Sequence, residues 1–307
     1  MPKHYITFRD LSPEEYSFLF TRTRKLKHER YTHHYSRPHL GGREVLMLFS
    51  KSSTRTRVSF ECAINELKGH PISMNMGDSQ WTRGEPLSHT ARVLSRYVSA
   101  IVIRHDKEKD LVELAKWAQI PVINALTDEH HPCQVLADVF TLLENLNGKA
   151  LEDQVVTWIG DGVNMANTWL EAAAVLGFGL HVACPEGYLP DKDILKQAMN
   201  DNPKIRLFNS PKEAAKGAFA ITTDVVASMG FEAEREKRLN DFKDYKVTRE
   251  IMALGKNDAI FLHCLPAHPG EEVEDEVLES AASVIFDEAE NRLHVQKALL
   301  EYLIPVL

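Results

Sequence analysis

The sequence predicts an α/β protein built from two doubly wound parallel-sheet domains. Short apolar runs rich in β-formers alternate with longer segments whose apolar residues recur at the helical period of about 3.6 residues. Strands that alternate with helices form right-handed crossovers around parallel sheets. The runs are apolar nearly throughout, which is typical of strands covered on both faces of a sheet.

The predicted elements follow one another in a regular order. Ser12-Pro13-Glu14-Glu15 begins a first helix, expected over residues 12–27. Strands are expected at residues 45–49, 72–74, 100–103 and 122–125, and then at residues 155–159, 181–183, 218–222, 259–262 and 283–286. Helices are expected between most of them, at residues 59–67, 90–97, 111–117, 133–145, 166–176 and 191–199.

The length of 307 residues suggests two domains of ordinary size. The helix at residues 133–145 ends in the turn Leu146-Asn147-Gly148-Lys149, which places the boundary after residue 147. We expect one domain at residues 1–147, a second at residues 148–287, and a last helix within residues 288–307 that returns to the first. Two helices would then join the domains. Because open parallel sheets bind ligands beyond the carboxyl ends of their strands, the active site is expected in the cleft between them.

Composition narrows the classes of partner and compartment. The formal net charge of −8 argues against nucleic acid as the main partner. The sequence contains no run of about 18 apolar residues, so no membrane span is predicted. The N-terminus lacks the apolar core of a signal peptide. Four scattered cysteines without C-x-x-C spacing suit free thiols in the cytoplasm. The stretch His28, His33, His34, His39 is irregularly spaced among Lys and Arg, which favours a solvated loop over a metal site.

The first predicted strand leads into Ser53-Thr54-Arg55-Thr56-Arg57 at the start of a helix. Ser and Thr are favoured N-caps, and a helix N-terminus presents unpaired N–H groups to an anion. The planar guanidinium of Arg55 matches phosphate oxygens, and hydrogen bonds to charged groups contribute about 1.5–3 kcal/mol each. The cluster therefore predicts an oxyanion site. The alternative is an ordinary capped helix, and for Arg57 alone we expect a helical pairing with Glu61.

Polar residues also follow the other predicted strands. In the first half these are Arg104 and His131-Pro132-Cys133-Gln134. In the second half they are Gly160-Asp161-Gly162-Val163-Asn164, Asp224 with Ser228-Met229-Gly230, and His263-Cys264-Leu265-Pro266. Cations in the first half and Asn, Asp, Ser and Cys in the second suggest two ligands that meet, an anion and an amine-bearing molecule.

In combination and in order, these motifs resemble the aspartate and ornithine transcarbamylase family. The match covers nearly the whole chain, through Glu288-Ala289-Glu290-Asn291-Arg292. Asp224, Ser228-Met229-Gly230 and His263-Cys264-Leu265-Pro266 resemble the ornithine members specifically. The resemblance implies transfer of the carbamoyl group of carbamoyl phosphate to the side-chain amine of L-ornithine, giving L-citrulline and phosphate in arginine metabolism.

The resemblance also implies roles for single residues. Carbamoyl phosphate would be held by Ser53, Thr54 and Arg55 at the phosphate, by Arg104, Thr56 and His131 at the carbonyl oxygen, by Gln134 and the Cys264–Leu265 backbone at the NH₂ group, and by Arg292. The domain of residues 1–147 would bind it, and that of residues 148–287 would bind ornithine through Asn164, Asp224, Ser228 and Met229. Gln80 would reach a neighbouring subunit's site in a homotrimer or a multiple of one.

Several positions depart from the family's usual pattern. Ser50 stands where ornithine members commonly have Glu, Val163 replaces the first Asn of an Asn-Asn pair, Val225 replaces a Trp, and Trp81-Thr82 replaces Leu-Gly. These departures bear on substrate affinity and loop packing rather than on the reaction class.

The chemistry implied needs no metal and no organic cofactor. Attack requires the neutral amine of ornithine, and an amine with a pKa of about 10.4 is neutral in only about one molecule in 2,500 at pH 7. The arginines of the site would disfavour the ammonium form. Arg104, Thr56 and His131 would stabilise the developing oxyanion. Asp224 and Cys264 would be anchors and electrostatic partners near the reacting end, and the residues do not single out one general base.

Other functions remain open from the residues themselves. A carbamoyltransferase that acts on another amine, such as putrescine, shares the same anion motif. Gly160-Asp161-Gly162 after a strand, with Glu186 further on, is a partial match to a nicotinamide-dependent dehydrogenase, but Met165 stands where the third glycine belongs. A Cys–His hydrolase would use Cys264, although His263 is its immediate neighbour and adjacent strand residues point to opposite faces.

Overall fold

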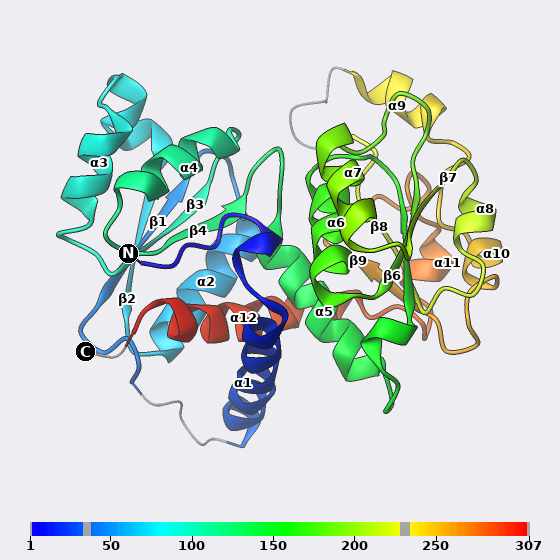
Figure 1. Ribbon diagram of the computed structural model, residues 1–307, viewed down its shortest axis with the longest axis horizontal. Helices are drawn as coiled ribbons and strands as arrows, with labels where there is room; N and C mark the ends of the chain where they lie inside the picture. The colour runs from blue at the N-terminus through cyan, green and yellow to red at the C-terminus, as the bar shows by residue number, and fades with distance from the viewer. Residues whose placement is uncertain (1, 33–37, 228–233, 306–307) are drawn as a thin grey trace. The chain divides into compact units, whose positions relative to one another are not determined.

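The computed structural model describes residues 2–32, 38–227 and 234–305, and they form two compact units, Met1–Ala137 with Glu290–Leu307, and Asp138–Ala289. The helices α5 (Pro132–Asn145) and α12 (Ile285–Leu303) each run from one unit into the other. The predicted α/β class, with parallel sheets and two connecting helices, is confirmed (Figure 1). Among the helices described, none is both long and apolar enough to cross a bilayer.

The first unit contains a four-stranded parallel sheet in the order β2-β1-β3-β4. Its elements are α1 (Pro13–Tyr31), β1 (Glu44–Phe49), α2 (Thr54–Glu66), β2 (His70–Asn75), α3 (Leu87–Leu94), β3 (Ala100–Arg104), α4 (Glu108–Trp117) and β4 (Val122–Leu126), with short 3₁₀ turns at Phe8–Asp10, Met76–Asp78 and Trp81–Arg83. The helix α1 begins as predicted, because Ser12 and Glu15 form a reciprocal capping box in front of Pro13.

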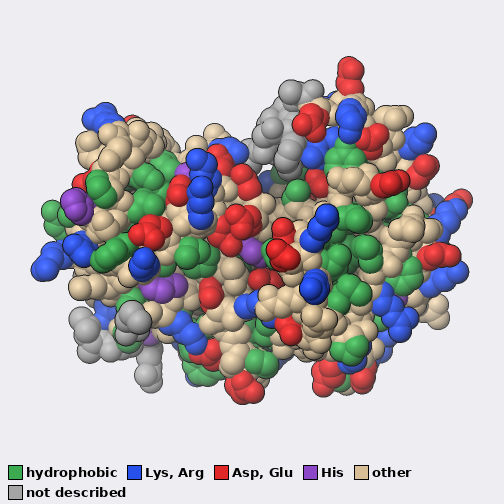
Figure 2. Space-filling view, turned by 45° about the horizontal axis from the view of Figure 1, so that its top comes forward, with side chains coloured by type: hydrophobic (Ala, Val, Ile, Leu, Met, Phe, Trp, Pro, Cys, Tyr) green, Lys and Arg blue, Asp and Glu red, His purple; other side chains and the backbone are tan. Residues whose placement is uncertain are grey.

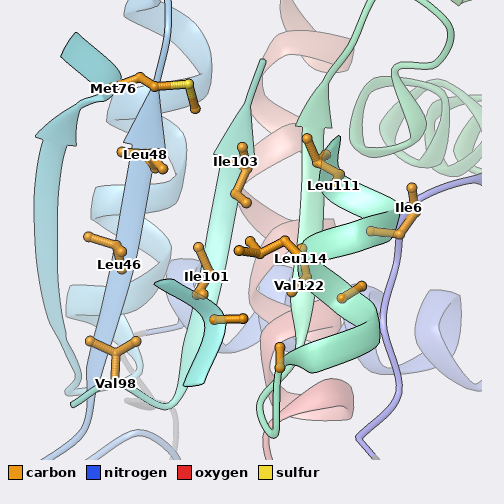
Figure 3. Close-up of a cluster of buried hydrophobic side chains, with 13 residues drawn as sticks. Ile6, Leu46, Leu48, Met76, Val98, Ile101, Ile103, Leu111, Leu114 and Val122 are labelled. Carbon is orange, nitrogen blue, oxygen red and sulfur yellow. The ribbon is translucent and has the colours of Figure 1, made fainter. Parts of the chain in front are cut away.

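One hydrophobic core cluster of this unit lies on one face of the sheet, against α3 and α4. Leu46, Leu48, Ile101 and Ile103 point to the same face because side chains two residues apart in a strand share a face. Figure 3 shows them with Leu111 and Leu114 of α4 to their right. The helix α2 lies behind the sheet, on its other face (Figure 3). Lys297 of α12 reaches Glu66 of α2 at 2.7 Å, so the last helix contacts this unit.

The second unit contains a five-stranded parallel sheet in the order β7-β6-β5-β8-β9. Its elements are a 3₁₀ turn at Leu151–Asp153, β5 (Val155–Ile159), α6 (Asn164–Leu176), β6 (Gly179–Ala183), α7 (Lys192–Asp201), β7 (Ile205–Phe208), α8 (Pro211–Ala214), β8 (Ala220–Thr223), α9 (Arg235–Asp241), α10 (Arg249–Met252), β9 (Ile260–His263) and α11 (Asp275–Leu278). Residues of α8, α10 and α11 pack with β5, β8 and β9 in one core cluster.

One strand predicted for this unit is absent from the residues that the structure describes, and one strand of the structure was not predicted. The strand expected at residues 283–286 is wrong: Ser283 forms a single bridge to Phe261, and α12 begins at Ile285. Asp287 and Glu288 stand in the first turn of that helix, where the helix dipole favours acidic side chains. Conversely, β7 was not predicted. It is an edge strand with two exposed residues out of four, so it lacks the continuous apolar run of the central strands.

The surface of the face shown in Figure 2 carries acidic and basic side chains interspersed rather than gathered by sign. Because the formal net charge of the chain is −8, an anion-binding site needs a local cluster of cations. Such clusters are expected at the carboxyl ends of strands, where consecutive strands of a doubly wound sheet send their helices to opposite faces.

Candidate active site

In the first unit, the sheet reverses its winding between β1 and β3. The two strands are neighbours although β2 comes between them in the chain, so their carboxyl ends form a topological switch point. Phe49 pairs with Arg104 there, and the N–H of Ser50 donates to the carbonyl of Arg104 at 2.9 Å. The residues that follow β1 and β3 are thus held at one edge of the sheet, which is the place predicted for the anion.

The helix α2 begins at this edge. Its N-cap is Ser53, whose backbone is extended and whose side chain makes no capping hydrogen bond. A helix has four N–H groups in its first turn without partners inside the helix, and a capping side chain ordinarily accepts from one of them. Because Ser53 does not do so, the first turn of α2 presents its N–H groups and the positive end of its dipole outward.

Three arginines gather at this helix start. Arg104, at the end of β3, is only 6% exposed. Its pKa is lowered first by burial and then by the positive charges of Arg292 and Arg55, with Asp106 opposing them. Cations destabilise one another at short range unless an anion is bound between them. The electrostatics of Arg55, Arg104 and Arg292 therefore favour an anion.

Arg292 is held rigidly within this group. Its Nη1 donates to Oε1 of Gln134 at 2.6 Å, and its Nη2 donates to Oγ1 of Thr56 at 2.8 Å. Arg292 is 3% exposed and lies in the part of α12 that belongs to the first unit. One guanidinium thus joins the start of α2, the start of α5 and the last helix, although these residues are far apart in the sequence.

His131 faces the same cations and is neutral. It is 5% exposed, and burial, followed by the charges of Arg292, Arg104 and Arg55, lowers its pKa well below the usual value. A neutral imidazole can donate one hydrogen bond without adding a further positive charge. Its backbone carbonyl accepts from the N–H groups of Gln134 and Val135 at the start of α5, which fixes its place.

A network that the sequence did not reveal surrounds His130, the residue before His131. The neighbouring His130 contacts Oε2 of Glu108 through Nδ1 at 2.8 Å, and Oγ1 of Thr127 donates to the same oxygen at 2.8 Å. Both Glu108 and His130 are buried. Glu108 stands in the first turn of α4 and reads from the sequence as an ordinary helix-start residue, so spacing alone offered no signal. The structure thus separates a supporting histidine, His130, from the one at the cationic cluster, His131.

Arg57 does not pair with Glu61, so this expectation is wrong. Its Nη2 donates to Oδ1 of Asn75 at 3.1 Å, and its guanidinium lies 5.1 Å from the centre of the Phe49 ring. The end of β2 and the aromatic ring of β1 are nearer partners than the next turn of α2. Arg57 is therefore a packing residue rather than part of the anion site, but its partners are Asn75 and Phe49 instead of Glu61.

In the second unit, the winding reverses between β5 and β8, which are neighbours in the sheet. The turn after β5 leads to Asn164 at the start of α6, where Oδ1 of Asn164 accepts from the N–H of Met165 at 2.8 Å. Asp224 follows β8, and its Oδ1 accepts from the N–H of Val225 at 2.7 Å. Asn164 and Asp224 thus stand at the switch point of the second sheet, as the motif order predicted. Ser228 and Met229 lie outside the described residues.

Cys264 contacts Asp224 at this edge. The thiol donates to Oδ1 of Asp224 at 3.2 Å. Burial, followed by the carboxylates of Asp224 and Glu288, raises the pKa of the Cys264 thiol well above its usual value. The thiol is therefore protonated near neutral pH and acts as a hydrogen-bond donor rather than as a nucleophile.

A buried ion pair that the sequence did not reveal supports the same edge. Asp161, two residues after the end of β5, contacts Nη1 of Arg238 in α9 at 2.5 Å, and Arg238 also donates to the carbonyl of Val226 at 3.2 Å. Both side chains of the pair are at most 7% exposed. Burial raises the pKa of Asp161, and the hydrogen bond from Arg238 opposes that shift. The pair ties the ends of β5 and β8 to α9, and its 77-residue separation in the chain hid it from pattern analysis.

Comparisons with known proteins agree with this arrangement. Residues 3–144 match the carbamoyl-P binding domain of aspartate/ornithine carbamoyltransferases, and residues 152–303 match their Asp/Orn binding domain. The chain belongs to the aspartate/ornithine carbamoyltransferase family.

Individual relatives resemble this family member over nearly its whole length. An ornithine carbamoyltransferase of Paracidovorax citrulli is 48% identical over 98% of this chain and 96% of its own, and one of Desulfotalea psychrophila is 49% identical over 98% and 99%. The solved ornithine carbamoyltransferase of Pyrococcus furiosus matches with a TM-score of 0.94 and 42% identity, covering 99% of this chain and 97% of that one. The anabolic enzyme of Campylobacter jejuni matches with a TM-score of 0.91 and 40% identity, covering 98% of both.

At two of the positions where this carbamoyltransferase-family chain departs from the usual pattern, the backbone makes the contact. Ser50 and Val225 use their N–H groups, toward Arg104 and Asp224, and these bonds do not depend on the side chain. Trp81 packs against the first unit's core, with its ring 5.2 Å from that of His105. Gln80, the residue before it, is exposed and makes no capping bond to the turn that it precedes.

The glycine turn after β5 has a packing explanation that differs from nucleotide binding. A Cβ on Gly162 would lie 2.2 Å from the backbone nitrogen of Pro190, and the N–H of Gly162 donates to the carbonyl of Tyr188 at 2.9 Å. A phosphate would need that N–H. A cavity of about 690 Å³ opens beside this turn, and its lining includes Asp161, Glu186 and Lys237. Carboxylates at this position disfavour the pyrophosphate of a dinucleotide.

The second unit also contains two clusters of metal-ligand types among the residues described: Asp224 with His263 and Cys264, and His268 with Glu271 and Glu272. In the first, the thiol is protonated and hydrogen-bonded to Asp224, and both ring nitrogens of His263 have partners within the chain. In the second, Glu271 forms an ion pair with Arg235. Hydrogen bonds and ion pairs thus account for both clusters.

Proposed function

We propose that this chain transfers the carbamoyl group of carbamoyl phosphate to the side-chain amine of L-ornithine, forming L-citrulline and phosphate. The observation that carries the proposal is the cluster of Arg55, Arg104 and Arg292 at the start of α2. It combines three cations with an uncapped helix N-terminus at the switch point of the first sheet. Family membership, with relatives named ornithine carbamoyltransferase, supports ornithine as the acceptor.

The phosphate of carbamoyl phosphate would occupy the first turn of α2. Ser53 and Thr54 would donate to it from the N-cap and the first helical position, and Arg55 would supply a two-pronged guanidinium contact. Phosphate carries its full charge as it leaves. Because these donors are in place before the reaction, the leaving group would be neutralised without reorganisation of solvent.

The carbonyl oxygen would lie among Arg104, Thr56 and His131. This oxygen becomes negative when the amine attacks, and donors fixed in a buried site stabilise such a charge more than water does. The neutral state of His131 suits this role, because a donor that is not itself charged adds no repulsion to the surrounding arginines. The carbamoyl NH₂ would donate to Oε1 of Gln134, an oxygen that can accept a second bond beside that from Arg292.

Ornithine would bind at the edge of the second sheet. Asn164 and Asp224, with Ser228 and Met229, would hold its amino-acid end, and the backbone at Cys264–Leu265 would meet the carbamoyl NH₂ group. The reacting amine must lose its proton. The three arginines would lower its pKa by charge repulsion, and exclusion of water would lower it further. The protonated thiol of Cys264 would serve as a partner for Asp224 rather than as a base.

We also propose the setting of this activity. The domain of residues 1–147 with the last helix would bind carbamoyl phosphate, and that of residues 148–287 would bind ornithine. The enzyme would work in the cytoplasm, in arginine biosynthesis, as a homotrimer or a multiple of one. The exposed Gln80 would then extend into the site of a neighbouring subunit.

A side-by-side assay tests the proposal against a different acceptor. Product formation from carbamoyl phosphate would be measured with ornithine, putrescine, acetylornithine and aspartate at equal concentrations. We expect citrulline formation from ornithine to be the fastest reaction. A faster reaction with putrescine would retain the anion site but change the acceptor. No reaction with any of the four amines would refute carbamoyl transfer as the function.

A further inference from the structure

The last residue of β9, His263, has a tautomer that is set by the neighbours of its two ring nitrogens. The N–H of Leu265 donates to Nδ1 of His263 at 2.9 Å. A ring nitrogen that accepts a hydrogen bond carries no proton, so the proton of the neutral ring must be on Nε2. That nitrogen lies 3.3 Å from Oε1 of Glu272. The ring therefore links a carboxylate on one side to a backbone N–H on the other.

Glu272 is fixed where it meets His263. It is 2% exposed, and its Oε1 also accepts from the N–H of His268 at 2.5 Å. Its own carbonyl accepts from the N–H of Val247 at 2.9 Å, and the next residue, Val273, belongs to the second unit's core. A buried carboxylate lacks its hydration shell and is retained at a cost in free energy. Here it faces two donors of one loop, those of residues 263 and 268.

The backbone held by His263 adopts an unfavourable conformation. Leu265 has φ of 59°, in the left-handed region, where the Cβ of a residue other than glycine crowds the following carbonyl oxygen. Such a conformation persists only where its surroundings enforce it. The bond from the Leu265 N–H to His263 is one such constraint, and the N–H of His263 itself is held by Oε2 of Glu288 at 2.8 Å. The carbonyl groups of Cys264 and Leu265 are oriented by this conformation.

We propose that Glu272 is a positioning residue for carbamoyl transfer: through His263, it keeps the Cys264–Leu265 backbone in the orientation that receives the carbamoyl NH₂ group. The inference rests on the proposed function. The carboxylate accepts the Nε2 proton and thereby stabilises the one tautomer whose Nδ1 can accept from Leu265. Without it, the proton can move to Nδ1, and the Leu265 N–H then loses its acceptor.

Kinetics of three variants test the positioning role. Glu272→Leu removes the acceptor and introduces an apolar side chain of similar size. Glu272→Gln keeps a carbonyl oxygen that can face both donors. Glu271→Leu is the matched control, because Glu271 pairs with Arg235 and does not contact His263.

We expect kcat to fall about 10- to 100-fold in Glu272→Leu, the range seen when a partner of a functional side chain is lost. Glu271→Leu should keep the wild-type kcat, and Glu272→Gln should keep most of it. The KM for ornithine should change little, because Asn164 and Asp224 are intact. An equal kcat in Glu272→Leu and Glu271→Leu would overturn the proposal.

The tautomer of His263 gives a readout that does not depend on activity. Its ¹⁵N resonances, assigned by comparison with His263→Asn, should show an Nε2–H ring in the wild type and in Glu272→Gln, and a mixture of tautomers in Glu272→Leu. An Nδ1–H ring in the wild type would overturn the proposal, and this measurement still decides if Glu272→Leu does not fold. If the wild type forms no citrulline, the proposed function fails. The histidine measurement then shows separately whether the chain from Glu272 to Leu265 exists.

Discussion

Replacing Arg55 with lysine separates the charge of this side chain from its shape. The substitution keeps a cation at the start of α2, so the electrostatic effects on Arg104 and His131, whose pKa values Arg55 helps to lower, are largely retained. What is lost is the planar guanidinium, which can contact two phosphate oxygens at once. Any change in activity therefore measures the two-pronged contact rather than the charge.

The size of the effect follows from the contacts that a lysine cannot make. A hydrogen bond to a charged group contributes about 1.5–3 kcal/mol, and about 1.4 kcal/mol corresponds to a factor of ten. Loss of one contact should lower kcat/KM for carbamoyl phosphate about 10- to 150-fold. Loss of both would lower it by up to about 10⁴-fold. Arg104 and Arg292 remain in place, so some activity should persist.

Steady-state citrulline assays on Arg55→Lys and Arg57→Lys check this reasoning. Arg57 lies two residues further along the same helix, but it contacts Asn75 and the Phe49 ring instead of the cationic cluster. The Arg57→Lys variant should therefore stay within about threefold of the wild type, because exposed polar contacts contribute about 1 kcal/mol or less. If Arg55→Lys turned over at a near-normal rate, or if both variants lost activity equally, the anion-site assignment would be refuted.

Two further predictions concern stability. Burial and three arginines hold the pKa of His131 in the folded chain well below its usual value. Between that pKa and about 6.5, the unfolded chain binds a proton at His131 and the folded chain does not, so the folded state loses stability as the pH is lowered through this window. Urea unfolding at pH 5 and pH 7.5 should show a smaller difference in His131→Gln than in the wild type. An unchanged difference would show that His131 is not kept neutral by folding; His4, His181 and His294, whose pKa values burial also lowers, account for a remaining slope. Gly162→Ala should lose about 1–3 kcal/mol, because its Cβ would overlap the backbone at Pro190, whereas Gly77→Ala, which meets open space, should lose less than about 1 kcal/mol in the same melts.

Central strands were predictable because burial on both faces demands apolar side chains throughout. The segments at β1, β3, β4 and β5 satisfy that demand, and each was expected within one residue of where it lies. The edge strand β7 contradicts the pattern because one side of it faces solvent, and Ile-Arg-Leu-Phe is too mixed to stand out. At residues 283–286 the reverse occurred. The short apolar run was read as a strand, although the same few apolar residues can be buried at the start of a helix, as they are at the start of α12.

The site motifs were predictable for a related reason. A residue type that binds a ligand from the end of a parallel strand must stand directly after an apolar run, so position in the sequence carries information about position in space. Supporting contacts have no such rule. Glu108 with His130 and Asp161 with Arg238 join segments that come together only when helices pack on a sheet, and Glu272 meets His263 only because the loop after β9 folds back on the strand end.

The sequence by itself determined the alternation of strands and helices, the residues at the strand ends and the family, because these depend on local composition and order. Only the tertiary structure decided which of two adjacent side chains faces the site. It placed His131 beside three arginines and His130 on a carboxylate, and it turned Arg57 away from Arg55 toward Asn75. Neighbours in a chain can face opposite directions, and their partners come from elements tens of residues away. Burial and charge at each atom therefore exist only in the folded protein.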